Sequence, residues 1–507
     1  MGDSPFHGYV ATDSAALYAA AEGRDLVANL LWGDGVQFLG DEIRYGRRKV
    51  RARGRTRVGW IDVAALEGGE PLLELYFIDV GQGDGVLIRT PDFRHILIDG
   101  GYSRSKQNAH KSAGDFVDWK FFEDYGKDRI ELDAMIASHN DEDHYGGLSD
   151  LLDPEQYAGG LEFDAGGIAV ENFYHAGLSW WNDDGKRTLG PVGEDARGRP
   201  CFTRILGDRA SAEAAVEGGA VPQLQGMWKR FIEKVVDARR IDGAPTPITR
   251  LHDAMGHLPG FGPDSTGGLA VHVLGPIGVE AEGHPALAVL GTNDSKSTNG
   301  NSVMLRLDYG RARILLTGDL NLAAHRLILE HLAGRKDELA CDVAKACHYG
   351  SDDVSFRFLE AVNAAATVIS SGDGEGHDHP RPAIVAASGL AGHREIRDDR
   401  VITPLVYCTE LARGVSLGRP IKLDVQHDGD RMTLQARGLG SAVVTYTEQK
   451  PGDLHARTRS RSLANTDVVA GLVYGLVNVR TDGRKILAAT MNEAKGDWSI
   501  KTFQSRF

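Results

Sequence analysis

The sequence is poor in cysteine and contains no long hydrophobic run. No window approaches the roughly 20 consecutive apolar residues that a membrane-spanning helix needs. The first residues, Met1–His7, lack the basic start and apolar stretch of a signal peptide. The cysteines are scattered and form no Cys-x-x-Cys pair, which fits reduced thiols; they are Cys201, Cys341, Cys347 and Cys408. These absences predict a cytoplasmic protein without a membrane partner.

Basic charge is not in excess either. The formal net charge is −14, so any nucleic-acid binding must come from a local basic face rather than from the bulk charge. The hydrophobic share of 42% and the charged share of 25% are those of an ordinary globular protein. At 507 residues the chain is long enough for more than one domain and a large core.

One short segment, Ser138–Gly147, concentrates side chains that bind metals. It follows the apolar run Leu132–Ala137, which predicts a strand, and it ends in a glycine pair that lets backbone pass close by. Imidazole and carboxylate groups are ligands of borderline to hard divalent cations. A single Asp-x-Asp pair is more often a turn, but four ligand-type side chains within six residues favour a metal site. They are His139, Asp141, Asp143 and His144.

Four more polar residues follow expected strands, where open α/β folds place their sites. Asp99 follows Ile96–Ile98, and the other three are His175, Asp319 and His348. Taken singly, each fits a turn cap or an ordinary hydrogen-bonded residue. The recurrence of one arrangement is what favours a shared site.

Three regions are expected along the chain. Residues 1–70 predict short strands joined by turns, and the pair Gly59-Trp60 resembles the signature of a bacterial SH3-like barrel. The basic run of this region, with Arg51 and Arg53, would guide a polyanionic substrate, although a solvated strand face explains it equally well. Residues 71–398 predict a catalytic domain, and residues 399–507 a β-rich extension with strands at Ala442–Tyr446 and Val468–Val479.

The central region predicts a meander of three strands, followed by alternating strands and helices. A polar, glycine-rich insert over about 177–263 interrupts it. Within the insert, Met227–Arg239 has the apolar spacing of a helix packed against the body of the fold.

Six motifs occur in the order seen in metallo-β-lactamase-fold hydrolases. They most resemble the branch typified by the nuclease domain of ComEC competence proteins, over residues 73 to 382 apart from the insert. The motifs are Phe77–Asp84, Ile98–Gly101, Ser138–Gly147, Asn301–Val303, Leu316–Asp319 and His348–Ser351. The multi-span membrane part of competence proteins is absent from this sequence, so a role in importing DNA through a pore is not expected.

The resemblance implies an αββα sandwich, here with a small N-terminal β-barrel and a β-rich C-terminal extension. It also implies two divalent metal ions, Mn²⁺ or Zn²⁺, which would activate a hydroxide. Asp99 would orient a ligand from behind, and His175 is the least diagnostic ligand. The implied ligands are His139, Asp141, Asp143, His144, His175, Asp319 and His348. The carboxylate of Asp141, where the wider superfamily has histidine, favours phosphodiester over β-lactam chemistry.

The sequence departs from the family pattern at two motifs. Tyr349 stands where a second histidine is usual, so the role of that histidine is lost or passes to Tyr349. The late Gly-His-Pro motif has two histidines here, His377 and His379, of which His379 is favoured. The residues expected to protonate a leaving oxygen or hold a phosphate are Tyr349, Ser351 and His379; Asp143 is a catalytic candidate as well as a ligand.

Three functions remain open at this point. The leading hypothesis is a metal-dependent phosphodiesterase, a nuclease with DNA as its substrate. The alternative is a small-molecule hydrolase, such as a cyclic-nucleotide phosphodiesterase or a lactonase, with the insert as a lid. A third is a non-enzymatic binding or sensor module that meets a protein partner through the SH3-like or C-terminal unit. The sequence does not indicate an oligomeric state.

Overall fold

The computed structural model describes residues 4–81, 83–107, 111–160, 162–219, 221–371, 379–409, 414–427, 430–448, 455–466, 468–473, 476–492 and 497–507. The chain forms two compact units. Unit 1 comprises Met1–Ala412 and Gly475–Phe507, and unit 2 comprises Arg413–Tyr474. Across the described ranges, no helix has the length and apolar character needed to cross a membrane.

The first sheet of unit 1 has nine strands in the order β18-β13-β11-β9-β8-β7-β35-β36-β37. Strands β7 to β9 form the expected antiparallel meander, and β9, β11, β13 and β18 run parallel. Strands β7, β8, β9 and β11 are buried on both faces, as continuous apolar runs predict. The bounds are β7 (Leu73–Ile78), β8 (Val86–Arg89), β9 (His95–Ile98), β11 (Ala134–Ala137), β13 (Phe173–His175), β18 (Ile248–Arg250), β35 (Leu476–Thr481), β36 (Lys485–Asn492) and β37 (Asp497–Gln504).

The second sheet has six strands in the order β19-β22-β23-β24-β25-β28. Its first three strands are antiparallel and the others parallel. The bounds are β19 (Leu269–Gly275), β22 (Met304–Tyr309), β23 (Ala312–Thr317), β24 (Val343–Lys345), β25 (Ala366–Ile369) and β28 (Leu405–Cys408).

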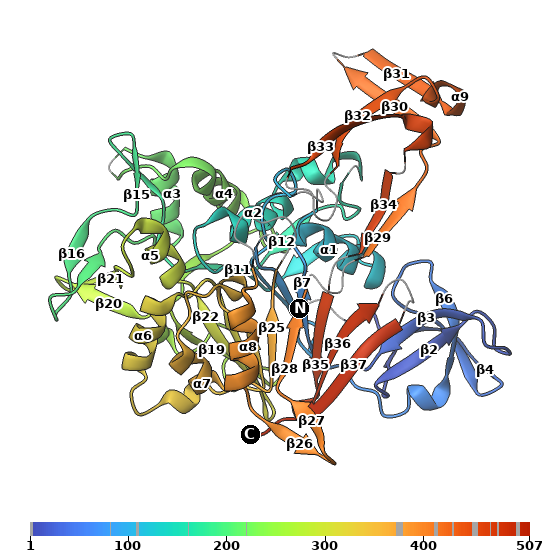
Figure 1. Cartoon of the computed structure of the whole chain (residues 1–507), viewed down its shortest axis with the longest axis horizontal. Helices are drawn as coiled ribbons and strands as arrows, with labels where there is room; N and C mark the ends of the chain where they lie inside the picture. Colours follow the sequence, from blue (N-terminus) through green and yellow to red (C-terminus); the bar gives the residue numbers. More distant parts are fainter. Residues whose placement is uncertain are drawn as a thin grey trace. The chain divides into compact units, whose positions relative to one another are not determined.

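The two sheets face each other and carry helices on their outer faces (Figure 1). Phe77 and Ile136 of the first sheet share one buried core with Val271 and Leu305 of the second. The outer face of the second sheet packs against helical residues such as Phe358. This arrangement confirms the αββα sandwich. The helices are α1 (Ala113–Trp119) and α2 (Glu142–Leu151) beside the first sheet, and α5 (Asp294–Gly300), α6 (Leu322–His331), α7 (Phe356–Val362) and α8 (Pro382–Ala391) beside the second.

The insert adds two helices and several short strands. The helix expected at Met227–Arg239 is confirmed as α4 (Gly226–Asp237), whose Trp228 and Phe231 pack on Tyr145 of α2 with ring centroids 5.1 and 4.8 Å apart. The other elements of the insert are β14 (Trp181–Asp183), β15 (Lys186–Thr188), β16 (Val192–Glu194), β17 (Pro200–Phe202) and α3 (Arg209–Glu217). Before the insert, β10 (Ile130–Leu132) pairs with β12 (Ile168–Val170), and after it come β20 (Gly278–Ala281) and β21 (His284–Ala288).

The N-terminal region forms a six-stranded sheet with a small core of its own, which includes Leu17, Val36 and Ile61. Short strands joined by turns are therefore present as expected, whereas the SH3-like assignment stays a prediction. The strands are β1 (Gly8–Tyr9), β2 (Ser14–Tyr18), β3 (Leu26–Leu31), β4 (Gly35–Arg44), β5 (Arg47–Arg51) and β6 (Val58–Asp62).

A buried charge network joins this region to the first sheet. Arg480 of β35 lies 2.7 Å from Asp34, 3.5 Å from Glu74, and donates to the carbonyl of Trp32 (2.6 Å). Arg53 pairs with the same Asp34 at 2.9 Å. Burial opposes ionisation of Asp34, but Arg480 and Arg53 outweigh it and hold its pKa below the usual range. Buried charges are tolerated when they are paired in this way.

The C-terminal extension expected over 399–507 is not a single unit. Strand β28 belongs to the second sheet, and β35, β36 and β37 extend the first. The run expected as one strand, Val468–Val479, divides into β34 of unit 2 and β35 of unit 1. The apolar pattern alone could not separate them, because both halves are rich in valine and leucine.

The described part of unit 2 consists of three two-stranded ribbons, one short α-helix and the 3-10 helix Leu463–Asn465. The expected strand at Ala442–Tyr446 corresponds to β32. The elements are β29 (Gly414–Gly418) paired with β34 (Val468–Val473), β30 (Lys422–His427) with β31 (Asp430–Gln435), β32 (Val443–Glu448) with β33 (Arg457–Ser462), and α9 (Ala436–Leu439). A further ribbon, β26 (Glu395–Arg397) with β27 (Arg400–Thr403), belongs to unit 1.

Candidate metal centre

The candidate ligands follow the carboxyl ends of strands in both sheets. His139 lies two residues beyond β11, and Asp99 directly follows β9. In the second sheet, Asp319 follows β23 and His348 follows β24. Helix α2 begins immediately after Asp141 and carries His144 in its first turn. Strand ends on facing sheets thus bring together groups that are far apart in the sequence.

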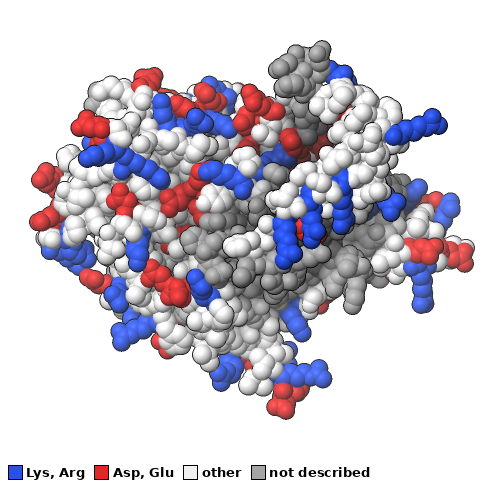
Figure 2. All heavy atoms as spheres, turned by 45° about the horizontal axis from the view of Figure 1, so that its top comes forward, with Lys and Arg blue, Asp and Glu red and all other residues white. Residues whose placement is uncertain are grey.

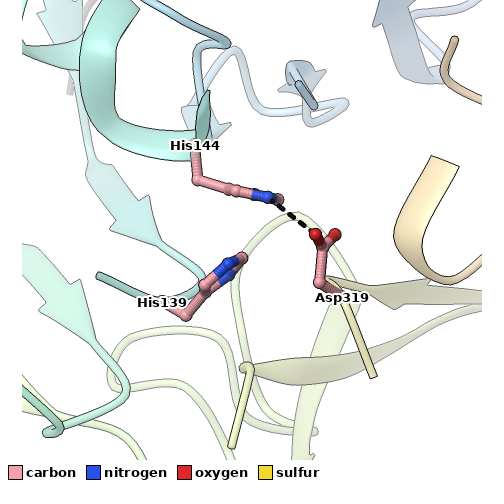
Figure 3. Close-up of side chains that lie close together, drawn as sticks. All are labelled: His139, His144 and Asp319. Atoms are coloured by element: carbon pink, nitrogen blue, oxygen red, sulfur yellow. Dashed lines mark ion pairs between the residues drawn. The ribbon is translucent and has the colours of Figure 1, made fainter. Parts of the chain in front are cut away.

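Three of these residues form a buried cluster with ligand atoms within 4.8 Å of one another (Figure 3). They are His139, His144 and Asp319, each at most 2% exposed. His144 Nε2 lies 3.3 Å from Asp319 Oδ2. Among the described residues, neither His139 Nε2 nor Asp319 Oδ1 has a hydrogen-bond partner. A divalent cation would satisfy both atoms, so the donor set fits a metal.

Neighbouring hydroxyls fix which nitrogen of His139 is available. Ser302 donates its hydroxyl proton to the carbonyl of Asn299 (2.7 Å), so it accepts from His139 Nδ1 at 3.3 Å. The same hydroxyl accepts the backbone N–H of Asp319 (3.0 Å). Burial and the adjacent His144 lower the pKa of His139 well below its usual value. The Nε2 lone pair of a neutral imidazole is therefore left for a metal.

Asp99 fixes the orientation of His144. Its Oδ1 accepts the backbone N–H of Ser138 (2.7 Å), and its Oδ2 lies 2.8 Å from Nδ1 of His144. A carboxylate behind an imidazole sets the tautomer that presents Nε2 to a metal. Burial opposes protonation of His144, but Asp319 and Asp99 outweigh it and raise its pKa well above the usual value.

Three further predicted ligands border the cluster. Asp141 Oδ2 lies 3.8 Å from His139 Nε2 and accepts from the hydroxyl of Thr298 (3.1 Å). Burial, together with Asp143, raises the pKa of Asp141 to about 6. His348 Nε2 lies 3.6 Å from Asp319 Oδ2, and Asp143 accepts a hydrogen bond from Tyr349. The structure therefore places all three beside the buried cluster.

His175 lies outside the cluster. It ends β13 beside β11, and its Nδ1 accepts the backbone N–H of Gly177 (3.2 Å). Burial lowers its pKa to about 3, with a smaller effect from Arg250. Its role as a ligand stays a prediction.

The predicted proton donors occupy different positions. The hydroxyl of Tyr349 contacts Nε2 of His144 and donates to Asp143 Oδ2 (3.1 Å). His379 lies beside it, with its ring 5.5 Å from that of His348. Ser351 instead accepts the backbone N–H of Asp353 (3.3 Å). The other histidine considered for this motif, His377, lies outside the described residues.

Glycines allow the backbone to close around the centre. A Cβ on Gly147 would lie 2.1 Å from the carbonyl oxygen of Gly100, so the pair after the metal motif does permit a close approach. Gly83 has a φ of +121°, and a Cβ there would lie 2.1 Å from the carbonyl oxygen of Asp143. Only glycine fits such a position without strain.

The αββα layers, and the His/Asp cluster at the strand ends that meet between them, decide the assignment of the fold. The chain forms the αββα sandwich that the motifs led us to expect, with the candidate metal centre where the strand ends of its two sheets meet.

Comparisons with known proteins give partial likenesses. No family model matches the chain. ComE operon protein 3 of Bacillus subtilis (strain 168) is 25% identical over 337 residues, which cover 64% of this chain and 32% of that protein. The chain thus spans about a third of the length of this curated relative.

Two solved structures resemble the chain more distantly. Tm1679, described as a metal-dependent hydrolase of the beta-lactamase superfamily, is 11% identical, with coverage of 66% of this chain and 95% of that one and a TM-score of 0.30. A mutant of CmlA beta-hydroxylase is 10% identical, with coverage of 74% and 55% and a TM-score of 0.29.

A buried ion pair beside the cluster of His139, His144 and Asp319 was not predicted from the sequence. Asp84 pairs with Lys345, and the ligand atoms of Asp84, Asp99 and His144 also lie within 4.8 Å of one another. Lys345 donates to the carbonyl of Thr317 as well (2.7 Å). Lys345 therefore gives Asp84 a buried cationic partner directly beside Asp99 and His144. A lone lysine in the apolar run Val343–Ala346 was the available signal.

The arginines expected to bind substrate also have partners within the protein. Arg53 pairs with buried Asp34 and lies over the ring of Trp498, and Arg51 donates to Gln37 (3.1 Å). Both side chains thus have partners within the protein, and their role in guiding a polyanion stays a prediction. Their alternation with small residues could not distinguish the two roles.

A role for Arg187 of the insert was not predicted, yet two contacts connect this residue to the metal-binding segment Ser138–Gly147. Trp180 donates its indole N–H to the carbonyl of Asn140 (2.9 Å), between His139 and Asp141. The exposed guanidinium of Arg187 stacks 3.6 Å from the Trp180 ring centroid. Among the described residues, no carboxylate lies within ion-pair distance of Arg187. An un-neutralised cation is thus held beside the metal motif.

Proposed function

We propose that this protein is a metal-dependent phosphodiesterase that cleaves nucleic acid, with DNA as the expected substrate. The observation that carries the proposal is the buried cluster of His139, His144 and Asp319 with the Asp141 carboxylate beside it. Similarity to ComE operon protein 3 supports the assignment of this chemistry, and the resemblance of the motifs to competence nuclease domains supports the substrate class.

The residues present fit divalent ions, with Mn²⁺ or Zn²⁺ expected. His139, His144, Asp319 and Asp141 would hold them, and His348 would complete the set. Bound ions would supply a water of lowered pKa and neutralise charge that develops on the phosphoryl oxygens.

The chain's own residues orient the ligands and supply a proton. Asp99 holds the proton on Nδ1 of His144, and Ser302 anchors both His139 and Asp319. The hydroxyl of Tyr349 and the imidazole of His379 are the candidates to protonate the leaving oxygen. General acid catalysis of this kind contributes typically 10²–10⁴-fold.

Arg187 is a further candidate for the substrate contact, in addition to Arg51 and Arg53. Its stack on Trp180 leaves the N–H groups at the edge of the guanidinium available to a phosphate. Arg187→Ala should raise KM for DNA about tenfold or more, because a hydrogen bond to a charged group contributes about 1.5–3 kcal/mol. Lys186→Ala, on the same exposed strand, is the matched control.

A substrate panel tests the function. Purified protein loaded with Mn²⁺ or Zn²⁺ is offered single-stranded DNA, duplex DNA, RNA, a cyclic dinucleotide and bis(p-nitrophenyl) phosphate. We expect metal-dependent cleavage of DNA that Asp319→Asn abolishes. Asp133→Asn should retain it, because Asp133 accepts only a backbone N–H from His95 in the same sheet. A metal-loaded protein that leaves every nucleic acid intact would refute the proposal.

Substrates with different leaving groups test whether Tyr349 donates a proton or only supports the structure of the site. Tyr349→Phe removes only the hydroxyl. We expect kcat for DNA to fall at least tenfold, while cleavage of bis(p-nitrophenyl) phosphate changes little because its leaving group needs no proton. An equal loss on both substrates would assign Tyr349 to the structure of the site.

A small-molecule hydrolase is the second candidate, and one observation favours it. The insert reaches the metal loop through Trp180, as a lid over a closed pocket would. Cleavage of the cyclic dinucleotide without cleavage of DNA would decide for this alternative.

A further inference from the structure

The charge of unit 2 differs in sign from that of the rest of the chain. Residues 413–474 contain nine Lys and Arg but six Asp and Glu, which gives a formal charge of +3. The rest of the chain has a formal charge of −17, which gives the net charge of −14 for the whole chain. Figure 2 shows a row of basic side chains to the right of its centre. An acidic protein with one basic unit has a local site for polyanions.

The basic charge is concentrated on one face of the β32–β33 ribbon. Arg457, Arg459 and Arg461 alternate along β33, and all three are exposed. Alternate residues of a strand share a face, so the three side chains emerge on one side about 7 Å apart. The ribbon therefore presents a regular row of guanidinium groups.

Cross-strand partners define the rest of this face. Arg457 lies opposite Glu448, Arg459 opposite Tyr446, and Arg461 opposite Val444. Among the described residues of the ribbon, Glu448 is the acid on this face, and it lies 3.5 Å from Arg459. The described strands of this face therefore carry three arginines, one glutamate and the ring of Tyr446.

The opposite face of the ribbon carries no charge. Its polar members are hydroxyls such as Thr445 and Ser460, which hydrogen-bond to each other at 2.9 Å. The arginines are therefore segregated on one face rather than spread around a solvated hairpin. Such segregation on a two-stranded ribbon is the electrostatic footprint of a nucleic-acid binder.

We propose that the arginine face of β32–β33 binds the nucleic-acid strand on which the metal centre acts. This inference rests on the proposed function, since it names the element that holds the same substrate. Guanidinium groups pair with phosphates and stack on bases, and Tyr446 offers an aromatic surface for stacking. The ribbon supplies affinity for the strand, whereas the metal centre supplies cleavage.

The test measures DNA binding by the full-length protein in EDTA, so that no strand is cut. Fluorescein-labelled single-stranded and duplex oligonucleotides are titrated at several salt concentrations. The variant replaces Arg457, Arg459 and Arg461 together by Gln. We expect at least tenfold weaker binding at about 0.1 M salt, and a salt slope reduced by about 2–3, because each phosphate contact contributes roughly 0.7–0.9.

Two further variants separate the effect of the ribbon from the effect of charge alone. Replacing the same residues by Lys retains the charge and should retain most of the salt slope. Replacing Arg394, Arg397 and Arg400 by Gln removes three exposed arginines at a hairpin of unit 1, β26–β27, and should leave DNA binding unchanged. Equal losses in this control would show a bulk-charge effect and overturn the proposal.

Failure of this inference is distinguishable from failure of the proposed function. If the Gln variant binds DNA as the wild type does, the ribbon proposal is wrong, even where the protein cleaves DNA. If it loses binding but the wild type cleaves no phosphodiester, the ribbon proposal stands and the nuclease assignment fails. Vesicles of phosphatidylcholine and phosphatidylserine (7:3) test a membrane surface; arginine-dependent vesicle binding with unchanged DNA binding would overturn the proposal.

Discussion

Asp99→Asn tests the geometry of the metal centre directly. The substitution keeps the size of the side chain, and its remaining oxygen can still accept the backbone N–H of Ser138. Its amide, however, would present N–H to Nδ1 of His144 where a carboxylate oxygen now lies 2.8 Å away. The imidazole would then carry its proton on Nε2, the atom that faces Asp319. That tautomer cannot bind a metal through Nε2.

The expected loss follows from the size of such effects. Removing a partner that orients a metal-bound histidine typically costs 10–100-fold in metal affinity, or about 1.4–2.8 kcal/mol. Competition with a chromogenic chelator measures this affinity without any assumption about the substrate. The activity on bis(p-nitrophenyl) phosphate at saturating metal gives a second reading.

Asp133→Asn is the control, since that carboxylate accepts a backbone N–H in the same sheet but touches no imidazole of the centre. Thermal unfolding of both metal-free variants shows whether the fold is intact. Wild-type metal affinity in a folded Asp99→Asn protein would refute the argument that Asp99 sets the tautomer of His144.

Three further results are expected. Arg480→Met should lower the free energy of unfolding in urea by about 3–5 kcal/mol, because it leaves buried Asp34 and Glu74 without their shared partner; a loss below about 1 kcal/mol would contradict this. The pKa of Asp34 is lowered in the folded state, so its stabilisation is present above the unfolded pKa of about 3.9 and is lost as the pH falls below it. Between about pH 5 and pH 3, the free energy of unfolding should therefore fall more for the wild type than for Asp34→Asn. An equal fall in both proteins would exclude this contribution of Asp34. Gly83→Ala should weaken metal binding several-fold in the chelator assay, since its Cβ would displace the backbone at Asp143; unchanged affinity would show that the loop adjusts freely.

The sequence predicted much of the centre because its signals are local. His139, Asp141 and His144 lie within six residues, and their chemistry is readable without a fold. Asp319 and His348 were predicted from a repeated position, the end of an apolar strand. The αββα layers followed from the resemblance of the motifs, and the structure confirms them.

Features that depend on distant partners were not readable. The pairing of β35 with β7 joins strands about 400 residues apart, and the sequence of neither strand indicates its partner. In the sequence, Arg53 is one basic residue in a basic run. Its contacts with Asp34 and Trp498 could be found only in the structure. Arg187 has meaning only through its stack on Trp180, which local sequence does not reveal.

The pairing of β7 with β35 also bears on how the protein is made. A ribosome adds about 5–20 residues per second, so roughly 20–80 s separate the synthesis of the two strands. During that interval β7 is an open sheet edge on the nascent chain, and such edges invite pairing with other chains. Arg480, which neutralises Asp34 and Glu74, emerges with the same late strand. Productive folding in the cell should therefore depend on chaperones that shield β7 until β35 arrives.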